Sequence, residues 1–67
     1  MKHLSKRRKN IRARLALKDM TAAALATNLG ISEAHMSNII NGKFNPGDDL
    51  AKKISRALGS TRAYLNL

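Results

Sequence analysis

The chain contains no cysteine, which excludes a disulfide framework, a thiolate nucleophile and a cysteine-based metal site. It also lacks long apolar runs, because the longest covers only residues 22–26. A transmembrane helix and the apolar core of a secretion signal both need longer runs. We therefore expect a cytoplasmic protein with no membrane partner.

Aromatic and acidic residues are scarce as well. Phe44 and Tyr64 are the two aromatic residues, which argues against a binder of RNA or single strands that stacks bases on rings. Four Asp and Glu residues stand against 13 Lys and Arg residues, so the formal net charge is +9. This excess predicts a polyanionic partner, nucleic acid first and an anionic membrane second. The 67 residues are expected to form one domain, 1–67, with little room for a catalytic cleft beside its core.

Residues 21–42, TAAALATNLGISEAHMSNIING, predict two short helices joined by a glycine turn. Thr21 is a suitable N-cap for the first helix, and Gly30 can take the left-handed conformation that ends it. Ser32 can cap the second helix, which runs to about Asn41. Two capped helices joined by a short turn form a helix-turn-helix. In so basic a chain this motif usually places its second helix, here about residues 32–41, in the major groove of DNA.

Three further helices complete the predicted all-α fold of five helices. One covers about residues 4–18, one begins near Asp48, and Ser60 caps a last short helix. Apolar residues at helical spacing are expected to form the core. They are Leu4, Ile11, Leu15, Leu25, Ala26, Leu29, Met36, Ile39, Ile40, Leu50, Ile54, Leu58, Tyr64 and Leu65.

The second helix of the motif has an outward face that predicts base contacts. If Met36, Ile39 and Ile40 face the core, the outward residues are Glu33, Ala34, Ser37, Asn38 and Asn41. Asn38 can pair with adenine through two hydrogen bonds, and Ala34 can pack on a thymine methyl group. Glu33 can accept from cytosine, and Ser37 can bind a base or a phosphate. The alternative is a solvated polar face on which Glu33 favours the helix N-terminus through the macrodipole.

A second set of residues is predicted to contact phosphates, which fix register rather than sequence. It comprises Ser32, Asn41, Lys43, Phe44 and Asn45. Phe44 and Asn45 would donate through their backbone amides, while Ser32 has a competing role as a cap. The basic cluster Lys6, Arg7, Arg8, Lys9 and Arg12 is either a solvated charged face or, in part, a phosphate-binding face.

No arrangement of residues predicts catalysis, a metal or a cofactor. His3 and His35 have no paired ligand at a good spacing, and Glu33 points away from His35. No acid is placed to orient an imidazole for a catalytic triad. We therefore expect that the protein is not an enzyme and holds no cofactor.

From Ile11 onward the chain resembles the Cro/C1-type (lambda-repressor-like) helix-turn-helix family of small phage repressors and their bacterial relatives. The matching residues are Leu25-Ala26, Leu29-Gly30-Ile31-Ser32, Met36-Ser37, Ile39, Asn41-Gly42-Lys43, Asn45-Pro46, Leu50, Ile54, Ala57-Leu58-Gly59 and Tyr64-Leu65. The resemblance implies five helices, the third of which reads DNA. It also implies binding to double-stranded operator DNA, usually as a homodimer, and repression of transcription.

The chain departs from the family pattern in three places. Ala22 stands where the family often has a Gln that touches a phosphate. Ile40 stands where a Glu commonly pairs with an Arg of the first helix, which would leave Arg14 facing phosphate or solvent. The turn at Lys18-Asp19 is one residue longer than in the shortest members. With no larger domain expected after Leu67, and hence no small-molecule effector domain, the chain looks more like the compact Cro type.

The leading hypothesis is a repressor that acts by occupying its operator, and is therefore associated with the nucleoid. One alternative is a DNA-binding antitoxin or autoregulator of a toxin–antitoxin pair, which would usually carry an additional toxin-binding tail. Another is a cationic membrane-active helix over residues 4–18, although its apolar stripe is narrow and has no Trp or Phe. The oligomeric state stays open, because residues 64–67 suit a dimer patch or a role in the core.

Overall fold

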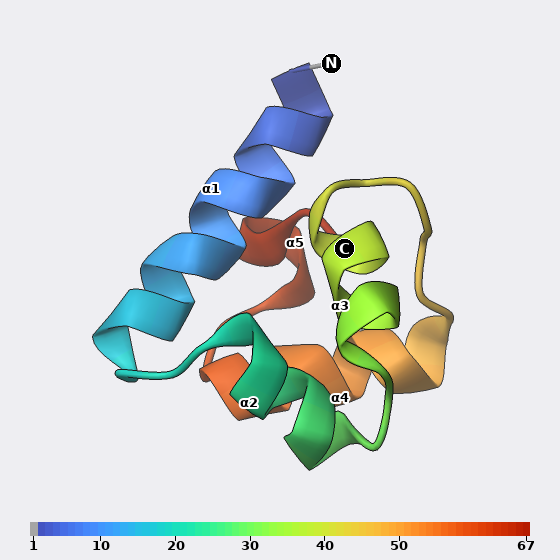
Figure 1. The fold of residues 1–67 in the computed structure, drawn as a ribbon. Coiled ribbons are helices and arrows are strands. Elements are labelled where there is room, and N and C mark those ends of the chain that lie inside the picture. Colours follow the sequence, from blue (N-terminus) through green and yellow to red (C-terminus); the bar gives the residue numbers. More distant parts are fainter. Residues whose placement is uncertain (1) are drawn as a thin grey trace.

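In a computed structural model of the chain, residues 2–67 are described, with side chains from Lys6 onward. The predicted all-α fold is confirmed, because the described residues form five helices and no strand (Figure 1). They are α1 (Lys2–Leu17), α2 (Ala22–Leu29), α3 (Glu33–Ile40), α4 (Asp48–Leu58) and α5 (Arg62–Leu65). The side chains of His3 and Leu4 lie outside the described residues, so the predicted core position of Leu4 is not tested.

The long helix α1 runs along one side of the molecule, and its first turns extend beyond the other helices (Figure 1). It packs against α3, α4 and α5, while α2 and α3 pack mainly against each other. The helix-turn-helix formed by α2 and α3 is therefore supported from behind by the rest of the bundle.

The caps predicted for the helix-turn-helix are confirmed. The hydroxyl oxygen of Thr21 accepts a hydrogen bond from the amide of Ala24 at 3.0 Å. That of Ser32 accepts from the amide of His35 at 3.0 Å. Gly30 ends α2 in the left-handed conformation, with φ of 73°, which glycine adopts without a steric cost. These local signals set where both helices begin and where the first one turns.

The N-cap of the last helix lies one residue later than predicted. Gly59 ends α4 in the left-handed conformation, and the amide of Ser60 donates to the carbonyl of Ser55 at 3.0 Å. Ser60 thus belongs to the end of α4. Thr61 caps α5 instead, because its hydroxyl oxygen accepts from the amide of Tyr64 at 3.1 Å.

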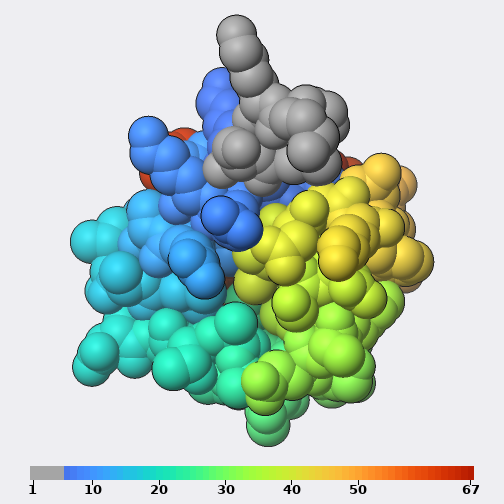
Figure 2. Space-filling view, turned by 45° about the horizontal axis from the view of Figure 1, so that its top comes forward, coloured from blue at the N-terminus to red at the C-terminus, as the bar shows by residue number. Residues whose placement is uncertain are grey.

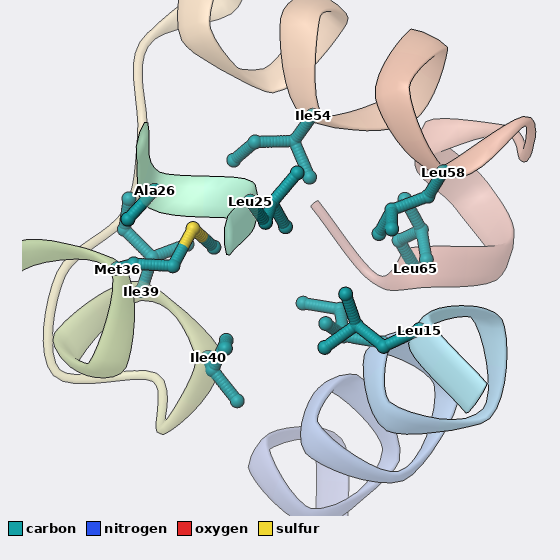
Figure 3. Close-up of a cluster of buried hydrophobic side chains, with 10 residues drawn as sticks. Leu15, Leu25, Ala26, Met36, Ile39, Ile40, Ile54, Leu58 and Leu65 are labelled. Atoms are coloured by element: carbon teal, nitrogen blue, oxygen red, sulfur yellow. The ribbon is translucent and has the colours of Figure 1, made fainter. Parts of the chain in front are cut away.

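The predicted rotation of the helices around the core is confirmed (Figure 3). The fully buried large side chains are Ile11, Leu25, Met36, Ile39, Ile54, Leu58 and Leu65. Leu29 and Leu50 pack at the edge of this cluster, and Ala51 is an additional buried residue. The predicted core position of Tyr64 is wrong, because 45% of this residue is exposed, whereas its neighbour Leu65 is fully buried.

Replacing Ile39 with Ala should lower the free energy of unfolding by about 2–5 kcal/mol, because it leaves a cavity between α3 and the rest of the core. Urea denaturation, monitored by circular dichroism, measures this loss of stability. Asn38→Ala is the matched control, since Asn38 is the preceding residue and is exposed. Equal stabilities for the two variants would contradict the rotation of α3.

Candidate nucleic-acid interface

One face of the molecule brings together α1, α2, α3 and the α3–α4 loop, while α4 and α5 lie mostly behind it (Figure 2). On this face the tight packing of α2 against α3 determines which side of α3 meets solvent. Leu25 and Ala26 of α2 and Met36 and Ile39 of α3 are buried together in one cluster. The opposite side of α3 is therefore turned outward.

The four residues predicted to contact bases share this outward side. Glu33, Ala34, Ser37 and Asn38 are all exposed. The side chain of Asn38 makes no hydrogen bond to any described part of the chain, so its amide keeps a donor and an acceptor for another molecule. The common exposure of the four residues is confirmed, and their base contacts stay predictions.

Hydroxyl and amide groups frame the two ends of α3. Ser32 uses its oxygen to cap the helix, which leaves its hydroxyl proton free to be donated. At the other end, the side-chain nitrogen of Asn41 donates to the hydroxyl oxygen of Ser37 at 3.3 Å. Ser37 also keeps a donor, so both serines can still bind a phosphate or a base.

The loop after α3 is held in place by the backbone of Asn38. The amides of Lys43 and Phe44 both donate to the Asn38 carbonyl, at 2.8 and 3.2 Å. The amide that would make the predicted phosphate contact of Phe44 is therefore already bound. The ring of Phe44 lies 4.7 Å from that of His35, whereas the side chain of Lys43 is exposed.

A buried arginine from the basic cluster of α1 connects this loop to the rest of the protein. Arg7 is only 6% exposed. Its guanidinium donates to the carbonyls of Asn66 at 3.0 Å and Ile39 at 3.1 Å, and to the side-chain oxygen of Asn45 at 2.9 Å. A longer bond of 3.5 Å reaches the carbonyl of Phe44. Burial lowers the pKa of Arg7, because loss of water disfavours the charged form.

The spacing of the α1 stripe contains a signal for this role of Arg7. Ile11 and Leu15 are buried, and position 7 precedes Ile11 by the same four residues. Arg7 therefore continues the inward stripe of α1. Its charge was the reason to expect a surface position. Since Arg7 occupies the Asn45 oxygen, a phosphate contact from Asn45 needs its side-chain nitrogen or its backbone amide.

Arg14 does not lack partners, contrary to the expectation from the missing Glu at position 40. Its guanidinium donates to the carbonyls of Leu58 and Gly59, both at 3.0 Å. These groups end α4, where a positive charge also interacts favourably with the helix dipole. Because its guanidinium is bound to the protein itself, Arg14 is not part of the proposed phosphate-binding set.

The described residues contain no group of three His, Asp or Glu side chains arranged to hold a metal ion. Over the same part of the chain, no helix is both long and apolar enough to cross a membrane.

Comparison with known families agrees with this geometry. A family model described as Helix-turn-helix matches residues 11–65, which include α2 to α5 and the C-terminal part of α1. The chain belongs to the Cro/C1-type helix-turn-helix family. This family consists of DNA-binding regulators and is not usually enzymatic, so this helix-turn-helix protein is a DNA-binding regulator. No curated protein and no solved structure matches the chain.

Replacing Arg7 with Met should lower the free energy of unfolding by about 1.5–3 kcal/mol, because several carbonyl groups lose a charged donor. The measurement is urea denaturation at neutral pH. Arg8→Met provides the control, since Arg8 is the next residue, carries the same charge and is exposed. A loss no larger than that of the control would mean that Arg7 does not tie the structure together.

Proposed function

We propose that the protein is a repressor that binds a specific double-stranded operator and blocks it by occupancy. The observation that carries this proposal is that α3 has one buried apolar side and one exposed polar side. The helix buries Met36, Ile39 and Ile40 and turns a polar side outward, on the same face of the molecule as α1 and the loop that carries Lys43.

In this proposal α3 lies in the major groove, where its N-terminal residues meet the edges of bases. Asn38 pairs with adenine N6 and N7, Ala34 packs on a thymine methyl group, and Glu33 accepts from cytosine N4. Ser37 donates to a base or to a neighbouring phosphate. The unpaired side-chain amide of Asn38 supports this assignment, because a bidentate base contact needs both its donor and its acceptor.

Phosphate contacts would come from residues at the ends of α3 and in the loop that follows it. The proposed set is Ser32, Asn41, Lys43 and Asn45. The high positive charge supports binding to DNA, since only the ion pair between Arg62 and Asp48, at 3.2 Å, forms within the described residues. The other exposed cations remain available to attract the DNA backbone.

We propose further that two copies bind one operator with twofold symmetry. The exposed Tyr64, next to the buried Leu65, is a suitable contact point for a second copy near the C-terminal end. A C2 dimer would place two α3 helices in successive major grooves, so the operator would be an inverted repeat with centres about 10–10.5 bp apart. A toxin partner, as in the antitoxin alternative, would add to this DNA role.

Selection of bound duplexes from a random pool tests the proposal as a whole. It reports the preferred sequence, its symmetry and the spacing of its half-sites in one experiment. Sedimentation of the protein on one selected duplex then counts the bound chains. A single asymmetric site bound by one chain would contradict the dimer and leave the role of α3 standing.

Asn38→Ala should weaken binding to the selected operator by about 1–3 kcal/mol, because a bidentate contact with its base is lost. Binding to random duplexes should change much less, since the matching base is rarely in place. Titration of both duplexes at one salt concentration measures the difference. Equal losses on the two duplexes would show that Asn38 does not read a base.

Lys43→Ala should weaken binding to all duplexes about equally, because Lys43 is proposed to contact phosphate. The slope of log K against log[salt] should become less steep by about one unit per chain. Affinities measured over a range of salt concentrations give this slope. A changed sequence preference would instead place Lys43 at a base.

A further inference from the structure

The orientation of α1 is determined by residues that point toward different neighbours. Arg7 donates to the carbonyl of Ile39 at the end of α3 and to Asn45 in the following loop. The side-chain nitrogen of Asn10 donates to the carbonyl of Tyr64 in α5 at 2.6 Å. One side of α1 therefore borders α5, and the Arg7 position faces the end of α3 and its loop.

The remaining positions around α1 follow from the helical rotation of about 100° per residue. Passing around the helix from Asn10, the inward residues come in the order Arg7, Ile11 and Leu15. The next positions beyond Leu15 are Arg8 and then Arg12, both exposed. They lie on the edge of α1 away from α5. Besides α4 and α5, the helix with which α1 makes its main contacts is α3.

The other exposed cations of α1 lie elsewhere on the helix. By the same rotation, Lys6 lies beside Asn10 on the α5 edge, and Lys9 lies opposite the buried stripe. The basic cluster of α1 thus divides into one buried residue, two residues on the α3 edge and two residues turned away. Figure 2 shows α1, α3 and the α3–α4 loop on the same face of the molecule.

We infer that Arg8 and Arg12 form an α1 phosphate edge that binds the backbone of the same duplex that α3 reads. This inference rests on the proposed DNA-binding role of α3. The two arginines are four residues apart, so their side chains are neighbours on one helix face. Each guanidinium can hold a phosphate through two parallel hydrogen bonds. Neither arginine forms an ion pair with a described residue, so neither has to release an acidic partner.

The buried Arg7 makes this edge a defined site, because it holds the part of α1 next to Arg8 against the loop that carries Lys43. Its bonds to Ile39 and Asn45 connect α1 directly to the end of the recognition helix. A phosphate bound at Arg8 or Arg12 would thus keep a constant position relative to α3. The edge extends the contact with DNA beyond the helix-turn-helix and adds affinity without reading sequence.

The double variant Arg8→Gln with Arg12→Gln tests the edge in the full chain. Each lost phosphate contact should reduce the slope of log K against log[salt] by about 0.9, so the slope should fall by about 1.8 per chain. The ratio of wild-type to variant affinity should then be about 12-fold higher in 0.05 M salt than in 0.2 M salt for one bound chain.

The matched control is Lys52→Gln with Arg56→Gln in α4. It removes the same charge from two exposed residues with the same spacing, on a helix that lies mostly behind the face of Figure 2. Its slope should stay within a few tenths of the wild-type slope. Circular dichroism melting at the salt concentrations used verifies that both double variants are folded.

Ethylation interference on the selected duplex adds a readout of position. Ethylation of certain phosphates should block binding of the wild-type protein but not of the Arg8/Arg12 variant. The control variant should be blocked at the same phosphates as the wild type. Equal slopes for the two double variants, or an unchanged interference pattern, would overturn the phosphate edge. If only the phosphate edge is wrong, Lys43→Ala should still reduce the salt slope, because α3 docks as proposed. If none of the variants affects binding, both proposals are overturned.

Discussion

The structure depends on the burial of one side of a single short helix. Isolated helices as short as the eight residues of α3 are marginal in water, so packing has to hold α3 in shape. Met36 and Ile39 are fully buried and Ile40 nearly so. When these side chains point inward, the helical rotation turns the side chains of Glu33, Ala34, Ser37 and Asn38 outward. The burial of the core side of α3 therefore also determines the surface that is proposed to bind DNA.

Asn38 links this constraint to the loop that follows. Its carbonyl accepts the amides of Lys43 and Phe44, while its side chain is left unbonded within the described chain. The backbone of this residue thus positions a proposed phosphate contact, and its side chain is the proposed base contact. If both proposed contacts form, this short connection would keep the phosphates in a constant position relative to the bases.

The arginines of α1 show how one type of side chain serves different purposes. Arg7 is buried and joins carbonyl groups from α3, the loop and the C-terminal end. Arg14 satisfies the last carbonyls of α4. Both interactions use the several donors of a guanidinium, which a lysine cannot arrange in the same plane. Part of the large positive charge therefore stabilises the fold, and only the exposed remainder is available for DNA.

The amino-acid sequence by itself determined the local features of this protein. Helix caps, turn glycines and apolar spacing are short-range signals, so Thr21, Gly30 and Ser32 were predictable, as was the inward side of α3. The roles of Arg7 and Arg14 were decided by tertiary structure, because their partners lie far along the chain. The shift of the last cap from Ser60 to Thr61 is instead local, because the amide of Ser60 closes the end of α4 on the carbonyl of Ser55. Position 7 carried the periodicity of a buried residue, but only carbonyl groups brought together from distant segments can compensate a buried charge. The sequence therefore indicated which side of α3 is exposed and proposed to bind DNA, and packing decided which cations remain exposed beside it.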